Sequence, residues 1–147
     1  MMSKFKVLIV EDEGNIFDMI KDEMDEKDYE FVRVRNVAQA IGEYKYAESP
    51  FNCYVVDLQI GSLGLLPQEM ADFFNLEGYA WIKKYVFNSM KEKEILDFKK
   101  KTIICSKYVT KFQNSFPPKE IDGFSLVNKE PHFESKVKKL ITQICEK

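Results

Sequence analysis

The chain has 147 residues, a formal net charge of -2 and 45% hydrophobic residues. This length and composition fit a packed globular domain and exclude a disordered chain. The nearly balanced charge gives no reason to expect a nucleic-acid partner, which would favour a clearly basic face. We expect a cytoplasmic protein without a membrane partner, because no apolar run is long enough to cross a bilayer and no signal peptide precedes the first strand.

The first half of the chain alternates apolar runs with helical patterns. In chain order we expect a strand over residues 6–10, a helix from Asn15 with that residue as its N-cap, a more exposed strand over 31–34, a helix over 37–47, and a strand over 53–58. Because the strand over 53–58 is almost wholly apolar, it should lie in the centre of a parallel sheet.

The second half begins with an unusual segment at about residues 60–77, in which Pro67 suits the first turn of a short extra helix. We then expect, in chain order, an amphipathic helix from Gly78, a charged linker over 91–101, a strand over 102–106, a weak helix from about Val109, a strand over 124–128 and a final helix over 133–145. Pro117 and Pro118 should end the weak helix.

This alternation predicts an α/β fold in a single domain spanning residues 1–147. We expect a doubly wound, five-stranded parallel sheet of flavodoxin-like order 2-1-3-4-5, with helices on both faces and the segment of about 60–77 inserted after the third strand. In such sheets, binding sites form at the carboxyl ends of strands near the reversal of strand order. Polar residues that follow strands are therefore the candidates for a site.

Five such residues should converge at that edge: Glu11, Asp12, Asp57, Ser106 and Lys129. The three carboxylates would repel one another without a counter-ion, and Mg²⁺ suits carboxylate and water oxygens. With the ion bound, Asp57 would stay ionised and could attack phosphorus to give an aspartyl phosphate. Ser106 could donate a hydrogen bond to one phosphoryl oxygen, and Lys129 could pair with another.

Four segments resemble the receiver domain of two-component response regulators, in the CheY-like superfamily. They are Val7–Glu13, Val55–Asp57, Ile103–Ser106 and Leu126–Lys129. Their order and spacing match the family across nearly the whole chain.

The resemblance implies a role for each candidate residue. Asp57 is the implied phosphoacceptor, with Ser106 as the hydroxyl that follows the phosphoryl group and Lys129 as its charge partner. The implied Mg²⁺ ligands are Asp12 directly, Glu11 mainly through water, Asp57, and the backbone carbonyl of Gln59.

The implied function is that of a single-domain response regulator with no output domain of its own. Mg²⁺-dependent phosphorylation on Asp57 would switch surface interactions in two-component signal transduction. The implied partners are a sensor histidine kinase or phosphotransfer protein and an unidentified downstream protein. Such a domain is not an enzyme beyond its own phosphotransfer and dephosphorylation.

Three departures from the family pattern bear on the function of the chain. The first is the insertion at about residues 60–77. The second is Lys107, which stands where a small residue normally leaves the pocket open. At the third, Glu130 separates Lys129 from Pro131, whereas in the family the proline usually follows at once. These departures favour an alternative function, a phosphorylation-independent pseudo-receiver that acts as a protein-interaction module.

A third possibility is a Mg²⁺-dependent enzyme acting on phosphate esters. A haloacid-dehalogenase-like phosphatase needs two aspartates one residue apart after the first strand, and Glu11-Asp12-Glu13 offers only one. A Toprim-like nuclease needs an aspartate where Gln59 stands. Both therefore fit less well than the receiver.

Two side-chain types bear on chemistry outside these motifs. Tyr108 lies two residues beyond Ser106 and should shield a phosphoryl group from water, which predicts slow self-dephosphorylation.

The three cysteines, Cys53, Cys105 and Cys145, are widely spaced and lack metal-binding spacing, so we expect reduced thiols in the core.

Overall fold

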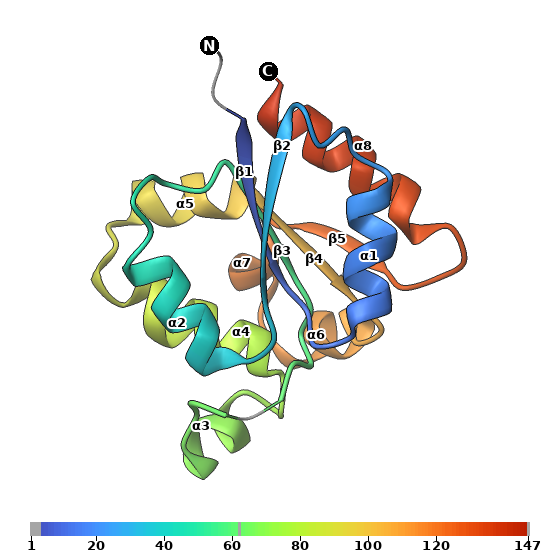
Figure 1. The fold of residues 1–147 in the computed structure, drawn as a ribbon. Coiled ribbons are helices and arrows are strands. Elements are labelled where there is room, and N and C mark those ends of the chain that lie inside the picture. The colour runs from blue at the N-terminus through green and yellow to red at the C-terminus, as the bar shows by residue number, and fades with distance from the viewer. Residues whose placement is uncertain (1–3, 62, 147) are drawn as a thin grey trace.

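The computed structural model describes residues 4–61 and 63–146. Its strands are β1 (Phe5–Val10), β2 (Tyr29–Val34), β3 (Cys53–Val56), β4 (Thr102–Ser106) and β5 (Ser125–Asn128). All neighbouring strands pair in parallel, and their order in the sheet is β2-β1-β3-β4-β5 (Figure 1). The predicted fold class and strand order are confirmed, while the extent of the domain over residues 1–147 stays a prediction.

Helices connect the strands. They are α1 (Gly14–Asp22), α2 (Val37–Lys45), α3 (Pro67–Asp72), α4 (Glu77–Trp81), α5 (Glu92–Lys100), α6 (Val109–Ser115), α7 (Pro118–Ile121) and α8 (Phe133–Cys145). After α4 the chain continues through a π-helical turn, η1 (Ile82–Val86), and a 3-10 turn, η2 (Phe87–Ser89). None of the described helices is both long and apolar enough to cross a membrane.

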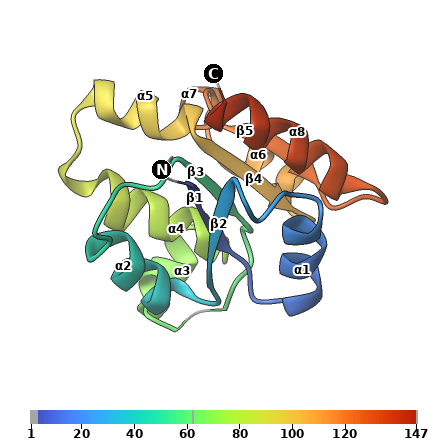
Figure 2. The same ribbon diagram turned by 45° about the horizontal axis from the view of Figure 1, so that its top comes forward.

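The sheet separates two hydrophobic layers, because successive side chains of a strand point to opposite faces. In β3, Cys53 and Val55 face the layer formed with α1 and α8, while Tyr54 and Val56 face the layer that includes α2, α4, α5 and α6. Figure 2 shows α1 and α8 on one side of the sheet and α2 and α4 on the other. The central strand is thus buried on both faces, as its apolar sequence predicts.

The prediction of a charged linker over residues 91–101 is wrong, because most of this stretch forms α5. The Glu94 carboxylate accepts a hydrogen bond from the backbone N–H of Lys91 at 3.2 Å and so caps the first turn. Phe98 is buried against Tyr54, with ring centroids 4.6 Å apart. Acidic residues in the first turn and lysines in the last turn also stabilise a helix. The order of charges along this segment therefore predicts a helix and not a linker.

Other boundaries shift by a few residues. Helix α1 begins at Gly14 with Glu13 at its N-cap, so the prediction of Asn15 as the cap is wrong. The reason is that the Glu13 carbonyl already accepts a helical hydrogen bond from the N–H of Phe17, at 3.2 Å. Strand β2 starts earlier than expected, β3 ends earlier and β5 starts one residue later.

The insertion contains the expected short helix, α3, with Pro67 at its start. Phe73 anchors it: this side chain is buried, and its ring lies edge-on to Tyr79 at 5.8 Å. Leu66 and Phe74 remain exposed. The insertion is therefore attached to the domain by buried side chains, among them Phe73 and Leu76, and carries other apolar side chains on its surface.

Helix α4 begins very close to the end of β3. The N–H of Gly78 donates to the carbonyl of Leu58 at 3.0 Å, and a Cβ atom built on Gly78 would lie 2.1 Å from the backbone oxygen of Asp57. No side chain fits at that distance, so glycine is required for this packing.

We expect Gly78→Ala to lower the free energy of unfolding by about 3 kcal/mol, the upper end for overpacking, because the added methyl group forces the backbone of Asp57 away from α4. Gly42→Ala is the matched control, since a Cβ there has nothing within 4 Å and lies in a helix. It should leave stability unchanged or raise it by up to about 1 kcal/mol. Urea denaturation measures both, and equal stability of the two variants would contradict the packing argument.

Candidate functional site

Backbone hydrogen bonds fix three site residues just beyond the ends of their strands. The N–H of Glu11 donates to Val34 O at 2.9 Å, and the N–H of Asp57 donates to Val10 O, also at 2.9 Å. The N–H of Lys129 reaches Ser106 O at 3.3 Å. Each bond continues the pairing of the sheet by one residue, so these side chains project from a rigid edge.

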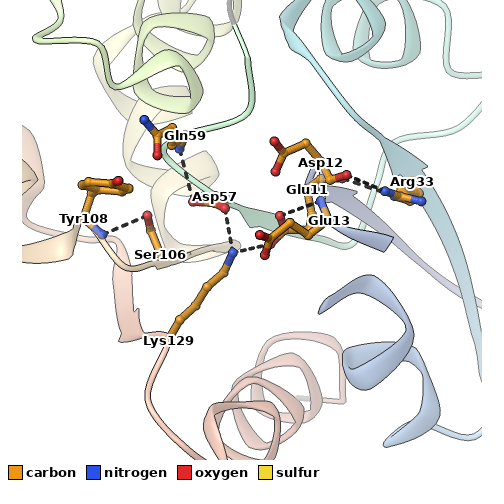
Figure 3. A network of polar contacts seen from close by, with 9 residues as sticks. All are labelled: Glu11, Asp12, Glu13, Arg33, Asp57, Gln59, Ser106, Tyr108 and Lys129. Carbon is orange, nitrogen blue, oxygen red and sulfur yellow. Dashed lines mark hydrogen bonds and ion pairs between the residues drawn. The ribbon is translucent and has the colours of Figure 1, made fainter. Parts of the chain in front are cut away.

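The Lys129 ammonium bridges two carboxylates at this edge (Figure 3). Its Nζ lies 2.6 Å from Glu11 Oε1 and 2.7 Å from Asp57 Oδ2. The side chains of Lys129, Glu11 and Asp57 are only 5%, 3% and 8% exposed. One buried ammonium therefore pairs with two buried carboxylates. When both carboxylates are ionised, the three side chains together carry a net negative charge.

The pKa values follow from this arrangement. Burial, and then the negative charge of Asp57, raise the pKa of Glu11 to about 7 in spite of its bond to Lys129. Burial alone would lower the pKa of Lys129, but the two carboxylates outweigh it and the pKa is raised above its ordinary value. The ammonium therefore stays charged, while the carboxylates still favour a further cation.

Asp12 completes an acidic cluster beside this bridge. Oxygens from Glu11, Asp12 and Asp57 all lie within 4.8 Å of one another. Ligand oxygens of an octahedral Mg²⁺ ion at about 2.1 Å would lie roughly 3 to 4 Å apart, so a small closure suffices. Three carboxylates, with the nearby Gln59 backbone, are a donor set that fits a hard divalent cation.

Arg33 positions the acidic loop, and sequence reasoning missed it. Its Nε donates to the carbonyl of Glu11 at 3.2 Å and its Nη2 to the carbonyl of Asp12 at 2.9 Å. The guanidinium thus holds the backbone of both residues while leaving their carboxylates available. The available signal was a charged residue next to the end of β2, within the otherwise apolar run Phe31–Val34.

Glu77 holds the other loop of the site and was also missed. Its carboxylate is buried and accepts a hydrogen bond from the N–H of Gly61 at 3.2 Å. Burial raises the pKa of this carboxyl above its ordinary value. Glu77 therefore fixes the chain two residues beyond Gln59, at the start of the insertion.

Ser106 ends β4 and is fully buried. Its hydroxyl oxygen accepts a hydrogen bond from the N–H of Tyr108 at 3.1 Å. Within the described residues, no hydrogen bond joins the Ser106 hydroxyl to the side chain of Asp57 or of Lys129. The structure therefore places Ser106 at the same edge, as expected, with its hydroxyl not bonded to the Lys129 bridge.

A small cavity opens over the bridge, with a volume of about 180 Å³. Its lining residues are Asp12, Glu13, Asp57, Gln59, Lys107, Tyr108 and Lys129. Asp57 and Lys129 form its floor, since both are buried, whereas Lys107 is exposed and Tyr108 is 37% exposed. Of the residues expected at the site, all except Glu11 and Ser106 reach this cavity.

The junction after Lys129 forms a tight turn before α8. The N–H of Glu130 donates to Asn128 O at 2.8 Å, and His132 adopts a left-handed conformation with φ 67° before α8. No peptide bond among the described residues is cis, including the one before Pro131. The turn therefore enters α8 with a trans proline.

No protein-family model matches the sequence, and no curated protein matches it. Solved structures do match, over nearly the whole chain. A sensor protein from Polaromonas sp. JS666 has a TM-score of 0.66 at 15% identity, with 98% of each chain covered. A CheY-like response regulator receiver domain protein from Methanospirillum hungatei JF-1 has a TM-score of 0.62 at 16% identity, over 98% of this chain and 96% of that one.

A third similar structure is response regulator protein TrrA from Thermotoga maritima, in complex with Mg²⁺-BeF. Its TM-score is 0.60 at 22% identity, over 94% of this chain and 99% of that one. The chain thus has the fold of CheY-like receiver domains, at low sequence identity, and the resemblance predicted from its motifs is confirmed at the level of the fold.

We expect Lys129→Met to lower the free energy of unfolding by about 3 kcal/mol, because Glu11 and Asp57 would face each other without their shared cation. Lys107→Met, at an exposed position on the same cavity, is the control and should change stability by less than about 0.5 kcal/mol. Chemical denaturation measures both changes. The bridge has no structural importance if the two variants are equally stable.

Proposed function

We propose that the chain is a receiver domain, spanning residues 1–147, that accepts a phosphoryl group on Asp57. The observation that carries this proposal is the lysine bridge: Lys129 Nζ lies 2.7 Å from Asp57 Oδ2 and 2.6 Å from Glu11 Oε1 at the floor of a polar cavity. A lysine, a reactive carboxylate and further acids for a cation are the parts that phosphoryl transfer to aspartate requires. The receiver fold, shared with known response regulators, supports the same proposal.

A divalent cation belongs to this proposal. Asp12, Asp57 and the Gln59 backbone carbonyl would hold Mg²⁺ directly, with Glu11 acting mainly through water. The bound ion would neutralise the acidic cluster and stabilise the charge that develops on the transferred phosphoryl group. The similar TrrA structure contains Mg²⁺-BeF, which supports Mg²⁺ as the ion.

The chemical step uses Asp57 as the nucleophile. A carboxylate oxygen attacks the phosphorus of the donor, an O–P bond forms, and the bond from phosphorus to the leaving group breaks with its electron pair. The N–H of Gln59 donates to Asp57 Oδ1 at 3.2 Å and orients the carboxylate. Lys129 is already within hydrogen-bonding distance of Asp57, so a small shift lets it pair with a phosphoryl oxygen.

Ser106 would respond after transfer. Its oxygen is used as an acceptor by the Tyr108 N–H, and so its proton remains to be donated to a phosphoryl oxygen. Phosphorylation adds up to about two negative charges, which would draw both Ser106 and Lys129 toward the modified Asp57. Movement of these two residues at the ends of β4 and β5 would change the adjoining surface, which a downstream protein would recognise. A sensor histidine kinase or a phosphotransfer protein would be the donor.

A second candidate function is a pseudo-receiver that binds partners without phosphorylation. The specific observation in its favour is that two lysines, Lys107 and Lys129, already line a cavity of about 180 Å³. They would neutralise part of the acidic charge and narrow the access of a donor.

The first test is phosphorylation by a small donor. With acetyl phosphate and Mg²⁺, the native chain should gain the mass of one phosphate, and Asp57→Asn should gain none because its nucleophile is lost. Asp97→Asn is a matched control, since that carboxylate is exposed and pairs with Lys101 outside the site. Intact-mass spectrometry reads all three proteins.

An unmodified native chain would count against the receiver proposal. The pseudo-receiver is then supported if beryllofluoride causes no Mg²⁺-dependent chemical-shift change around Asp57. A phosphate gained equally by Asp57→Asn would place the acceptor elsewhere.

The lifetime of the phosphate gives a separate test. Tyr108 lines the cavity and its ring would obstruct water approaching the phosphoryl group, so Tyr108→Ala should lose phosphate several-fold faster than the native chain. Tyr108→Phe keeps the ring and should behave like the native chain. Phos-tag electrophoresis measures how fast the phosphorylated form of each protein disappears. Slower or equal loss of phosphate in Tyr108→Ala would contradict the shielding argument.

A further inference from the structure

A further cavity is lined by residues of α4, η1, η2, α5 and α7, away from the acidic site. Its volume is about 370 Å³, a size that suits a small molecule. The apolar part of its lining includes Phe87, Ile95 and Leu96, and three lysines also line it: Lys83, Lys99 and Lys119. This cavity shares no lining residue with the one over the bridge between Asp57 and its lysine, so the two sites are separate.

Lys99 differs from the other two lysines because it is buried. It is only 6% exposed, whereas the Lys83 side chain is 45% exposed and Lys119 is exposed. The stem of Lys99 packs on the turn before β5: a Cβ atom built on Gly123, where φ is 104°, would lie 3.2 Å from Lys99 Cβ. The Lys99 ammonium lies 5.4 Å from the centroid of the Phe124 ring, which attracts a cation. The Lys99 side chain is therefore held in a defined position.

The Lys99 ammonium has more hydrogen-bond donors than the fold uses. It carries three N–H groups, and among the described residues it donates only to the backbone carbonyl of Lys119, at 3.3 Å. No ion pair in the described part of the chain includes Lys99. The Glu120 carboxylate is engaged elsewhere, because it accepts a hydrogen bond from the Tyr79 hydroxyl at 2.7 Å and pairs with Lys83 at 3.1 Å. A buried lysine thus lines the cavity without a carboxylate of its own.

The charges around the cavity favour an anion. Three lysines and two glutamates, Glu92 and Glu120, line it, which leaves an excess of one positive charge. Burial, and then the charge of Lys83, lower the pKa of Lys99, while Glu120 and Asp122 oppose this shift without reversing it. The folded chain therefore disfavours the charged form of Lys99, and a bound anion would relieve that penalty.

We propose that this cavity binds a small organic carboxylate with an apolar body. The carboxylate would accept a hydrogen bond from Lys99 Nζ, and the apolar body would pack on Phe87, Ile95 and Leu96. Because Lys99 is buried, this ion pair is stronger than one on the surface. An inorganic anion would bury no apolar surface, and a neutral ligand would leave the ammonium without a counter-charge.

The first test compares two ligands of the same shape on the native chain. Cinnamate carries a carboxylate, and cinnamamide has a neutral amide in its place. Isothermal titration calorimetry should show saturable binding of cinnamate, at least about ten-fold tighter than that of cinnamamide, because only the carboxylate pairs with Lys99. In amide NMR spectra, the signals that cinnamate shifts should belong to α4, α5 and α7 and not to the residues around Asp57.

The second test removes the charge. Lys99→Met keeps an unbranched stem and should bind cinnamate at least about ten-fold more weakly than the native chain. Lys100→Met is the matched control, since Lys100 is the exposed neighbour and does not line the cavity, and it should bind within about two-fold of the native chain. Circular dichroism checks that both variants fold. The comparison of the two ligands needs no variant, so it decides the matter if Lys99→Met does not fold.

The proposal is overturned if the native chain does not bind cinnamate or binds cinnamamide equally well. It is also overturned if folded Lys99→Met binds cinnamate as tightly as the native chain, or if the shifted amides lie outside α4, α5 and α7. None of these readouts depends on phosphorylation.

Discussion

The site depends on a single side chain that spans three strand ends. Strand order places β1 beside β3, so Glu11 and Asp57 are neighbours, but β5 lies beyond β4. With strands about 4.8 Å apart, Lys129 starts roughly 10 Å from the end of β3, and only a long side chain closes that gap. Its path crosses the end of β4, where Ser106 is small and fully buried. A lysine after β5 and a small residue at the end of β4 are therefore two parts of one geometric requirement.

This bridge is costly as a structural element. Two buried carboxylates share one ammonium, and burial together with the charge of Asp57 keeps the pKa of Glu11 high. Buried ion pairs of this kind are weak contributors to stability, and apolar side chains of the same size would often serve better. The arrangement makes physical sense as a place that attracts positive charge. Asp12 adds a third carboxylate on the exposed side, where a cation could enter.

Much of the sheet and of this cluster could be predicted from the sequence, because both follow from local patterns. Apolar runs define the strands, and parallel strands bring their carboxyl ends to one edge. The parts that were missed depend on tertiary partners that no local pattern names. Arg33 acts through two backbone carbonyls, and Glu77 reaches Gly61 across the whole length of the insertion. Helix α5 was missed for a different reason. Its charged residues were interpreted as a solvated linker, although acidic residues at the start and lysines at the end are the order found in a capped helix.

The insertion is the largest departure from the receiver pattern, and it is attached at the site itself. Glu77 holds Gly61 by a hydrogen bond, and Gly78 packs so closely on Asp57 that no Cβ fits between them. A change in charge at Asp57 therefore acts on backbone that is in contact with both ends of the inserted segment. Because Leu66 and Phe74 are exposed on that segment, its apolar surface lies on a stretch of chain that begins and ends beside Asp57. The surface most directly coupled to Asp57 by contact is thus this added segment, in addition to the faces that follow β4 and β5.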